Sequence, residues 1–373
     1  MILVQTLPVA RHAGTTNYIA NVAENEDILV SVRNGVGIVT LNRPKAINSL
    51  NDVMVAGLQH ALTEWEHNDE VKTVLLTGAG ERGLCAGGDV VALYHSARGD
   101  KAYARKFWWD EYLLNAHIGR FAKPYVAVMD GIVMGGGVGI AGHGSVRVVT
   151  ERTKMGMPEV GIGFIPDVGG TYLLSRTPGL LGMHAALTGA PFSGPDAIAM
   201  GFADHFVPHD RLPDFIEAVV TDGHEDALNS YAEEPPESDL LAQRHWIDSC
   251  YAGDTVAQIL ADLRSHADEA QGHDGGNAAA AAAELIATRS PIALAVTLTS
   301  IRRAAHLHTL EEVLAQEFRV SVASLASHDF VEGIRAQLVD KDRNPQWSPA
   351  TLDAVDEAAI DAYFASANPD LTF

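Results

Sequence analysis

The chain has 373 residues, of which 47% are hydrophobic and 20% charged, and its formal net charge is −22. This composition is typical of a globular protein with one large domain or two of ordinary size. The acidic balance disfavours nucleic acid and anionic membranes as partners, because both bind basic surfaces.

Residues 1–26 have no clear period and are predicted to form an N-terminal extension. They lack the basic segment and cleavage signal of a secretory leader, and no stretch of the chain reaches the roughly 18 apolar residues of a membrane span. Cys85 and Cys250 stand in no C-x-x-C pair, so neither a disulfide framework nor a zinc site is indicated. We therefore expect a cytoplasmic protein.

The next residues predict a β-hairpin. Two apolar runs, residues 28–33 and 36–41, flank Asn34 and Gly35. An Asn-Gly pair between two apolar runs is the strongest short signal for a hairpin.

A strand, a glycine-rich loop and a helix then recur along the chain. The first helix is expected to be capped by Asn51 or Asp52, because apolar residues follow at helical spacing, and another is expected from Thr171. Such an alternation is typical of an α/β domain, which we place at residues 27–210. Buried-type strands are predicted over residues 71–78, 125–131, 145–151 and 202–208.

Helical spacing dominates after residue 210, for example in residues 254–270 and 309–326. The six alanines at positions 278–283 are strong helix formers. Residues 211–373 are therefore predicted to form a helical C-terminal region.

Two glycine loops, residues 86–89 and 135–137, each follow a predicted strand and precede a helix. A glycine backbone can approach a ligand closely, and the start of a helix carries free N–H groups. Two such groups aimed at one point would form an oxyanion hole for a carbonyl that gains negative charge. The same glycines could instead serve only tight turns and close helix packing.

Glu159 and Asp167 stand eight positions apart in the otherwise apolar stretch MPEVGIGFIPDVGG. Buried carboxylates are costly unless they are paired or used, so this pair is a candidate catalytic site. Two structural interpretations remain open: Pro158 and Glu159 could open a helical turn, and Asp167 could cap the following helix.

Other catalytic patterns are absent or weak. Residues 137–142 fit G-x-G-x-x-G with Glu159 downstream, but that acid follows Met-Pro rather than ending a strand, which disfavours dinucleotide binding. No G-x-S-x-G elbow occurs. His117 and His143 are predicted to be structural, and no spacing of His, Asp and Glu indicates a metal.

Four motifs together, NRPKAINSL, CAGGD, MGGG and the segment from MPE to PDVGG, resemble the crotonase superfamily, the enoyl-CoA hydratase/isomerase fold. The resemblance extends from about Ile28 to Phe364. It implies an α/β fold, built as a crotonase-like spiral of repeated ββα units with a helical C-terminal region. It also implies an acyl-CoA substrate, with coenzyme A as part of that substrate and no separate cofactor.

Within the superfamily the chain is most similar to the hydrolase branch, on account of DEYLLNAHI, MGGGVG, the Asp of PDVGG and the late stretch HDFVEGIRAQLVDKDRNPQW. Hydratases use two glutamates. One corresponds to Glu159, but the position of the other is Gly139, and Asp167 stands where hydratases typically carry a small residue. The resemblance thus implies hydrolysis of a short-chain 3-hydroxyacyl-CoA thioester, with 3-hydroxyisobutyryl-CoA of valine catabolism as the expected substrate. An enoyl-CoA hydratase or isomerase and a non-catalytic acyl-CoA-binding protein remain alternatives.

The resemblance also implies roles for individual residues. The N–H groups of Gly88 and Gly136 would form the oxyanion hole, Glu159 would be the main catalytic carboxylate, and Asp167 would assist it. The remaining expected substrate contacts are Glu111, Lys45, Ala46, Ala86, Gly87, Asp89 and Gly135.

Assembly is predicted only loosely. Crotonase relatives often form trimers or pairs of trimers, so a homo-oligomer is possible. The helical C-terminal region could cover the surface that such an assembly uses.

Overall fold

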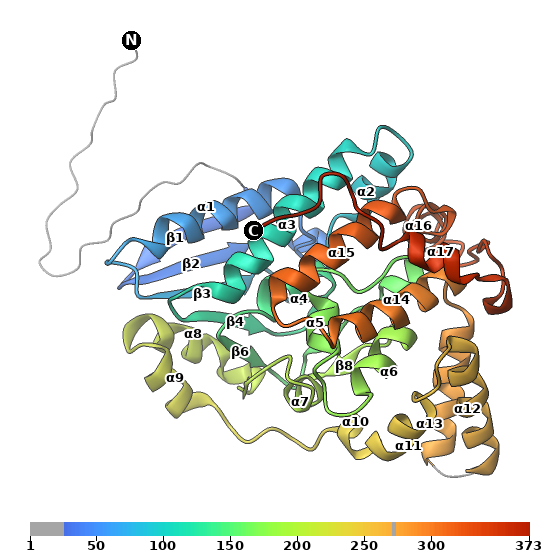
Figure 1. Ribbon diagram of the computed structural model, residues 1–373. Coiled ribbons are helices and arrows are strands. Elements are labelled where there is room, and N and C mark those ends of the chain that lie inside the picture. The colour runs from blue at the N-terminus through green and yellow to red at the C-terminus, as the bar shows by residue number, and fades with distance from the viewer. Residues whose placement is uncertain (1–25, 271–273) are drawn as a thin grey trace, which may run out of the picture.

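The computed structural model describes residues 26–270 and 274–373 (Figure 1). The predicted N-terminal extension, apart from its last residue, lies outside these described residues.

The predicted hairpin is confirmed. Strands β1 (Ile28–Arg33) and β2 (Val36–Leu41) pair antiparallel, with Arg33 opposite Val36. Asn34 and Gly35 have positive φ values of 51° and 79°. Positive φ at both central residues is what a type I′ turn requires, and Asn-Gly is the pair that adopts it most readily.

Six strands form the main sheet, in the order β1-β2-β3-β4-β6-β9. From β2 onward the neighbouring strands run parallel, as expected when each is followed by a crossover helix. These strands agree with the sequence prediction, although the last has only two residues. Their bounds are β3 (Thr73–Gly78), β4 (Tyr125–Met129), β6 (Val146–Val149) and β9 (His205–Phe206).

A second, smaller sheet has three short strands in the order β5-β7-β8. Along the chain, β5 follows β4 and β7 follows β6, each a few residues after the strand of the main sheet ends. Strands of two or three residues carry no readable period, so the sequence did not predict them. Their bounds are β5 (Ile132–Met134), β7 (Lys154–Gly156) and β8 (Phe192–Ser193).

Helices cover both faces of the main sheet. Apolar residues of β3, β4 and β6 pack on one face against Leu212 and Phe215 of α8, while the largest core lies on the other face with α1 and α3. A parallel sheet buried on both faces is typical of α/β folds. The bounds are α1 (Asp52–Glu66), α2 (Val90–Ala97), α3 (Ala102–Arg120), α4 (Gly136–Ala141), α5 (Gly170–Leu174), α6 (Leu181–Thr188), α7 (Gly194–Ala199), α8 (Leu212–Thr221) and α9 (His224–Tyr231).

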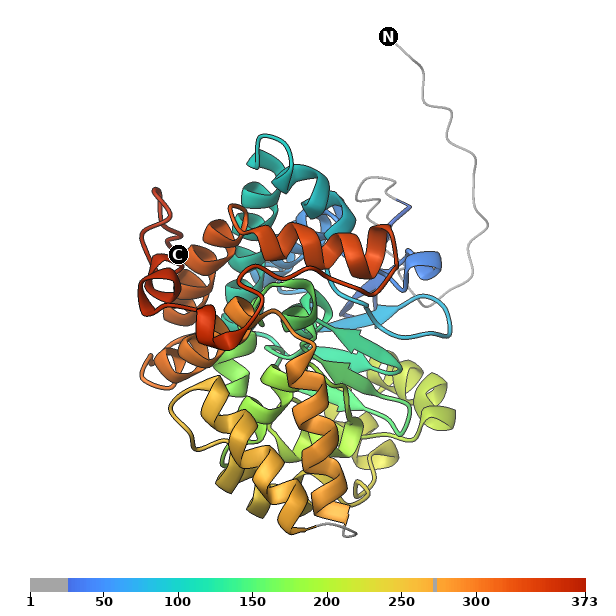
Figure 2. The same cartoon turned by 90° about the vertical axis from the view of Figure 1, so that its right-hand side faces the viewer.

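The rest of the described chain is helical and folds back over the first part (Figures 1 and 2). Helix α15 contacts α3 and α5, and α16 contacts α2, so C-terminal residues reach the region of the glycine loops. The bounds are α10 (Asp239–Ala242), α11 (Arg244–Cys250), α12 (Val256–Glu269), α13 (Asp274–Ala287), α14 (Pro291–Ala304), α15 (Leu310–Ser324), α16 (His328–Ile334) and α17 (Glu357–Ala362), with a π-helical turn, Arg335–Val339, after α16.

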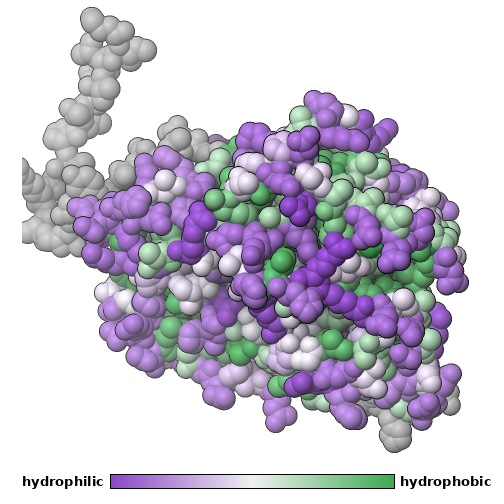
Figure 3. Space-filling model, viewed as in Figure 1, coloured by the Kyte–Doolittle hydropathy of each residue, from purple (hydrophilic) through white to green (hydrophobic). Residues whose placement is uncertain are grey.

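The surface seen from the side of Figure 1 is mostly hydrophilic, with hydrophobic residues scattered among the charged ones (Figure 3). Across residues 26–270 and 274–373, no single helix has the length and apolar character of a membrane span. One pair, Gly275–Ala287 with Pro291–Ala304, passes that test together, but it is bent by 114°.

Candidate active site

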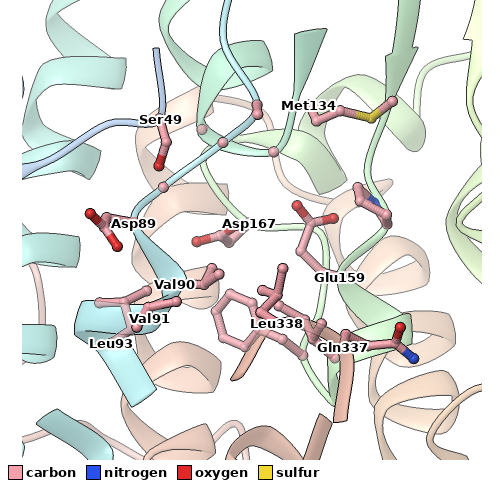
Figure 4. Close-up of a pocket in the computed structure, with 18 of the residues that line it drawn as sticks. Ser49, Asp89, Val90, Val91, Leu93, Met134, Glu159, Asp167, Gln337 and Leu338 are labelled. Atoms are coloured by element: carbon pink, nitrogen blue, oxygen red, sulfur yellow. The ribbon is translucent and has the colours of Figure 1, made fainter. Parts of the chain in front are cut away.

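A cavity of about 690 Å³ lies where the two glycine loops meet the stretch that holds Glu159 and Asp167. Figure 4 shows both carboxylates pointing into the same space, with Val90 and Leu338 below them. Other residues that line this cavity include Ala46, Ala86, Gly87, Gly88, Asp89, Trp108, Glu111, Gly135, Gly136, Phe164, Phe330 and Lys341.

Backbone bonds link the two glycine loops to each other, and link the first of them to the chain segment at Leu50. Met134 N–H donates to the carbonyl of Cys85 over 2.9 Å, and Leu50 N–H donates to that of Gly87 over 2.8 Å. Gly87 and Gly135 have positive φ values of 106° and 48°. Residues that carry a side chain rarely adopt such φ angles, so glycine is needed at both turns.

The amides of Gly88 and Gly136 come close together as a result. A Cβ atom placed on Gly136 would lie only 3.3 Å from Gly88 N. Within the described part of the chain, neither N–H donates to a protein acceptor. Two free amides beside one point in a cavity are what an oxyanion hole requires.

Glu159 begins a short 3-10 turn, Glu159–Ile162, directly after Pro158. The predicted helical turn therefore exists, but it does not account for the carboxylate. The side chain is buried, and its Oε2 has no partner among the described residues. Its Oε1 lies 2.7 Å from where a Cβ on Gly135 would be. Burial, and then the neighbouring Asp167, raise the pKa of Glu159 well above its usual range.

Asp167 lies in the loop before α5 and accepts a 2.7 Å hydrogen bond from the phenol of Tyr112. The N-cap of α5 is Gly169, so the interpretation of Asp167 as a helix cap is wrong. Burial raises the pKa of Asp167 to about 7, although the bond from Tyr112 acts in the opposite direction.

Glu111 comes from α3 and is a third buried carboxyl group in the cavity. Its Oε1 has no partner among the described residues and lies 2.7 Å from where a Cβ on Gly136 would be. Burial, and then Asp167, raise its pKa well above the usual range. Three carboxyl groups that share one apolar pocket cannot all ionise at neutral pH, so protons are shared among them.

The expected substrate-contacting residues of the loops reach the cavity, with one exception. Lys45 is exposed and outside the lining, and its carbonyl accepts a 2.7 Å bond from Arg82. Asp89 lines the cavity, but it also caps α2 and lies 3.3 Å from Arg43.

Gly139 has no room for a side chain. It lies inside α4, where a Cβ would come 2.6 Å from Val168 Cβ and 2.9 Å from Asn115 Nδ2. The second hydratase carboxylate is thus missing from the sequence, and the packing leaves no space for it either.

The histidines and the G-x-G-x-x-G pattern have structural roles. His143 Nε2 lies 2.8 Å from the carbonyl of Val168, and His117 Nδ1 lies 2.8 Å from Gln59 Nε2. Most of residues 137–142 lies within helix α4 rather than in a strand-to-helix turn, which explains why the pattern is not a dinucleotide fingerprint. In the described part of the chain, no three His, Cys, Asp or Glu side chains group to hold a metal ion.

The sequence analysis missed several residues around the cavity. The aromatic rings of Trp108, Phe164 and Phe330 pack together there, with centroids 5.3 to 5.8 Å apart. Trp108 stands one helical turn before Glu111, a spacing that could have indicated it. Glu317 of α15, which does not line the cavity, gave no such signal.

The comparisons with known proteins agree on one family. A family model described as enoyl-CoA hydratase/isomerase matches residues 36–364. The mitochondrial 3-hydroxyisobutyryl-CoA hydrolase of Danio rerio is 39% identical over 343 residues, which cover 88% of this chain and 87% of that protein.

Two solved structures are similar over nearly their whole length. One, described as a carnitinyl-CoA dehydratase from Mycobacterium thermoresistibile, has 67% identity and a TM-score of 0.90, covering 94% of this chain and 99% of that one. The other, described as an enoyl-CoA hydratase from Rhodobacter sphaeroides, has 39% identity and a TM-score of 0.86, covering 93% of this chain and all of that one.

These relatives contradict the predicted cytoplasmic location, because the curated hydrolases are described as mitochondrial. The prediction was wrong for a physical reason. The absence of a secretory leader and of a membrane span does not distinguish the cytoplasm from an organelle, because organellar targeting segments have a different, amphipathic and Arg-rich character.

Proposed function

Since the chain belongs to the enoyl-CoA hydratase/isomerase family, we propose that it hydrolyses 3-hydroxyisobutyryl-CoA to 3-hydroxyisobutyrate and coenzyme A. One observation carries this proposal. The free amides of Gly88 and Gly136 and the buried carboxyl groups of Glu159 and Asp167 lie in the same cavity. The names of the curated relatives, at 36–40% identity, support the same reaction.

The thioester carbonyl oxygen accepts hydrogen bonds from the N–H groups of Gly88 and Gly136. These bonds strengthen as the carbonyl becomes tetrahedral and its oxygen gains negative charge. Removing one such donor typically slows acyl transfer by about 10²–10³.

Glu159 supplies the attack on the carbonyl carbon. It either attacks directly, forming a mixed anhydride that water then cleaves, or takes a proton from an attacking water. In both routes the C–S bond breaks and coenzyme A leaves as its thiol.

Asp167 faces the same space and assists Glu159. With a pKa raised to about 7, it holds a proton in part of the molecules at neutral pH. That proton can pass to the departing sulfur, or the carboxyl group can bind the 3-hydroxyl of the acyl chain. Glu111 contacts the acyl group from the side of α3.

The loops around residues 46 and 86–89 hold the pantetheine and adenine portions of coenzyme A. Lys341 lines the same cavity and lies on the molecular surface, where its ammonium group can contact the coenzyme A phosphates.

Residues 27–210 form the acyl-CoA-binding core in this proposal, and residues 211–373 form the helical region that covers it. In this proposal the product, 3-hydroxyisobutyrate, is an intermediate of valine catabolism.

A dehydratase or hydratase is the second candidate, because the two solved structures carry those descriptions. Both reactions move water across a carbon–carbon double bond and leave the thioester intact. The packing of Gly139 against Val168 disfavours them, because no second glutamate fits there.

Thiol release separates the candidates. The purified protein is mixed in parallel with 3-hydroxyisobutyryl-CoA, crotonyl-CoA and carnitinyl-CoA, and free coenzyme A is followed with a thiol reagent. We expect rapid release from the first substrate alone. Gain or loss of a conjugated double bond without thiol release would assign the protein to the dehydratases or hydratases. No turnover of any of the three would favour a non-catalytic acyl-CoA-binding protein.

A further inference from the structure

The loop that carries Asp167 has an unusual backbone conformation. Val168 has a φ of +55° and Gly169 a φ of +77°. A β-branched residue at positive φ is a genuine outlier, and such a conformation persists only when its surroundings enforce it. Something outside the loop must therefore hold it.

Glu317, on α15 of the C-terminal region, makes the main contacts to this loop. Its carboxylate accepts from Gly169 N–H over 2.7 Å, from Thr171 N–H over 2.9 Å and from the Thr171 hydroxyl over 2.5 Å. The side chain is fully buried. Burial raises the pKa of Glu317 to about 8, although the three donors at the start of α5 act in the opposite direction.

The same helix reaches Asp167 by a second route. Ser321, one turn after Glu317, lies 2.7 Å from the phenol oxygen of Tyr112, and that phenol donates to Asp167. On the other side of the loop, His143 contacts the carbonyl of Val168. The peptide unit that joins Val168 to Gly169 is thus held from outside the loop at both its carbonyl and its N–H group.

We propose that Glu317 is a positioning residue for hydrolysis: by binding Gly169 and Thr171 it holds Val168 at positive φ and keeps the Asp167 carboxyl group in the cavity that Glu159 also lines. Glu317 does not line the cavity, so in this proposal it acts through the loop and not on the substrate. The inference rests on the proposed role of Asp167 in hydrolysis. It gives the C-terminal region a part in the reaction beyond covering the site.

The variant Glu317→Gln tests the proposal. A glutamine has one acceptor oxygen and one NH₂ donor, so it cannot accept from both Gly169 and Thr171. We expect kcat for 3-hydroxyisobutyryl-CoA to fall at least tenfold while KM changes less than threefold. Gln316→Ala is the matched control, because it removes a buried hydrogen bond from α15 to Ser300 without touching the loop. Its kcat should stay within twofold of wild type.

A double mutant separates positioning from general destabilisation. If Glu317 acts through Asp167, adding Glu317→Gln to Asp167→Asn should change kcat by less than about twofold. An equal loss in both backgrounds would overturn the proposal. Should Glu317→Gln fail to fold, Thr171→Val removes one of the three donors and should lower kcat by a smaller factor, again only when Asp167 is present.

A crystal structure of Glu317→Gln tests the inference independently of activity. We expect Val168 to leave positive φ and the Asp167–Tyr112 distance to exceed 3.5 Å. An unchanged loop would overturn the inference even if the proposed reaction holds. Absence of thiol release by the wild-type protein would instead refute the proposed function, while the loop rearrangement would still report on Glu317.

Discussion

Tyr112, on α3, donates its phenolic hydrogen to Asp167, in the loop before α5, over 2.7 Å. Both groups are buried, and 55 positions separate them in the sequence. The bond favours the ionised form of Asp167 and so opposes the effect of burial, which raises the pKa of this carboxyl group to about 7.

Replacing Tyr112 by Phe should therefore raise the pKa of Asp167 further. The inflection in the pH–rate profile that belongs to Asp167 should move upward from about 7, whichever protonation state the reaction uses. For an upward shift of about one pKa unit, we expect kcat at pH 7 to fall about fivefold if the reaction uses the ionised form of Asp167, and to rise about twofold if it uses the protonated form. The measurement is kcat from pH 5 to 9 for both proteins. If the inflection of the pH–rate profile lies at the same pH in both proteins, the hydrogen bond from Tyr112 does not affect the pKa of Asp167.

Glu159→Gln should lower kcat by about 10²–10⁴, the usual contribution of a general base. The fold should not suffer, because the pKa of Glu159 is raised well above its usual range by burial, and a neutral amide of the same shape is easier to bury than a carboxylate. Thermal unfolding is thus expected at the wild-type temperature or above it. Full activity in this variant would remove Glu159 from the mechanism.

The local features of this fold were predictable from sequence, and the long-range ones were not. Asn34 and Gly35 are sufficient to predict the turn between the first two strands. The glycines at 87, 88, 135 and 136 predict a close approach of the backbone to another group, although they do not identify that group. Glu317, in contrast, binds an amide 148 positions earlier, and on its helix it resembles any other glutamate. Its burial depends on how α15 packs against α3 and α5, which no periodicity encodes.

The oxyanion geometry makes Gly136 intolerant of any side chain. In Gly136→Ala the new Cβ would lie 2.7 Å from Glu111 Oε1 and 3.2 Å from Leu50, so the loop or the carboxylate must move. We expect kcat to fall by about 10²–10³, the cost of losing one oxyanion donor. Gly99→Ala is the control, since its Cβ would meet only the carbonyl oxygens of His95 and Ser96, at 3.5 Å or more. Equal activity in both variants would show that the loop at Gly136 does not bind the thioester.

The aromatic cluster indicates how the acyl chain is limited in length. Phe330 of α16 packs against Trp108 and Phe164, with ring centroids 5.8 and 5.3 Å away, and all three rings line the cavity. They bring together α3, the stretch between Glu159 and Asp167, and the C-terminal region. An acyl group bound beside the carboxylates therefore meets aromatic rings rather than open solvent.

Phe330→Ala should open this wall. The truncation costs about 3–5 kcal/mol of folding free energy, so the assay belongs well below the unfolding temperature. Each methylene that enters the new space gains about 0.8 kcal/mol, close to fourfold in kcat/KM. Measured for 3-hydroxyacyl-CoA substrates of increasing length, kcat/KM should rise for the longer chains relative to 3-hydroxyisobutyryl-CoA. Phe318→Leu, a core substitution on α15 outside the lining, should lower stability and leave that preference unchanged. The same shift in both variants would mean that loosened packing, and not the wall at Phe330, determines chain length.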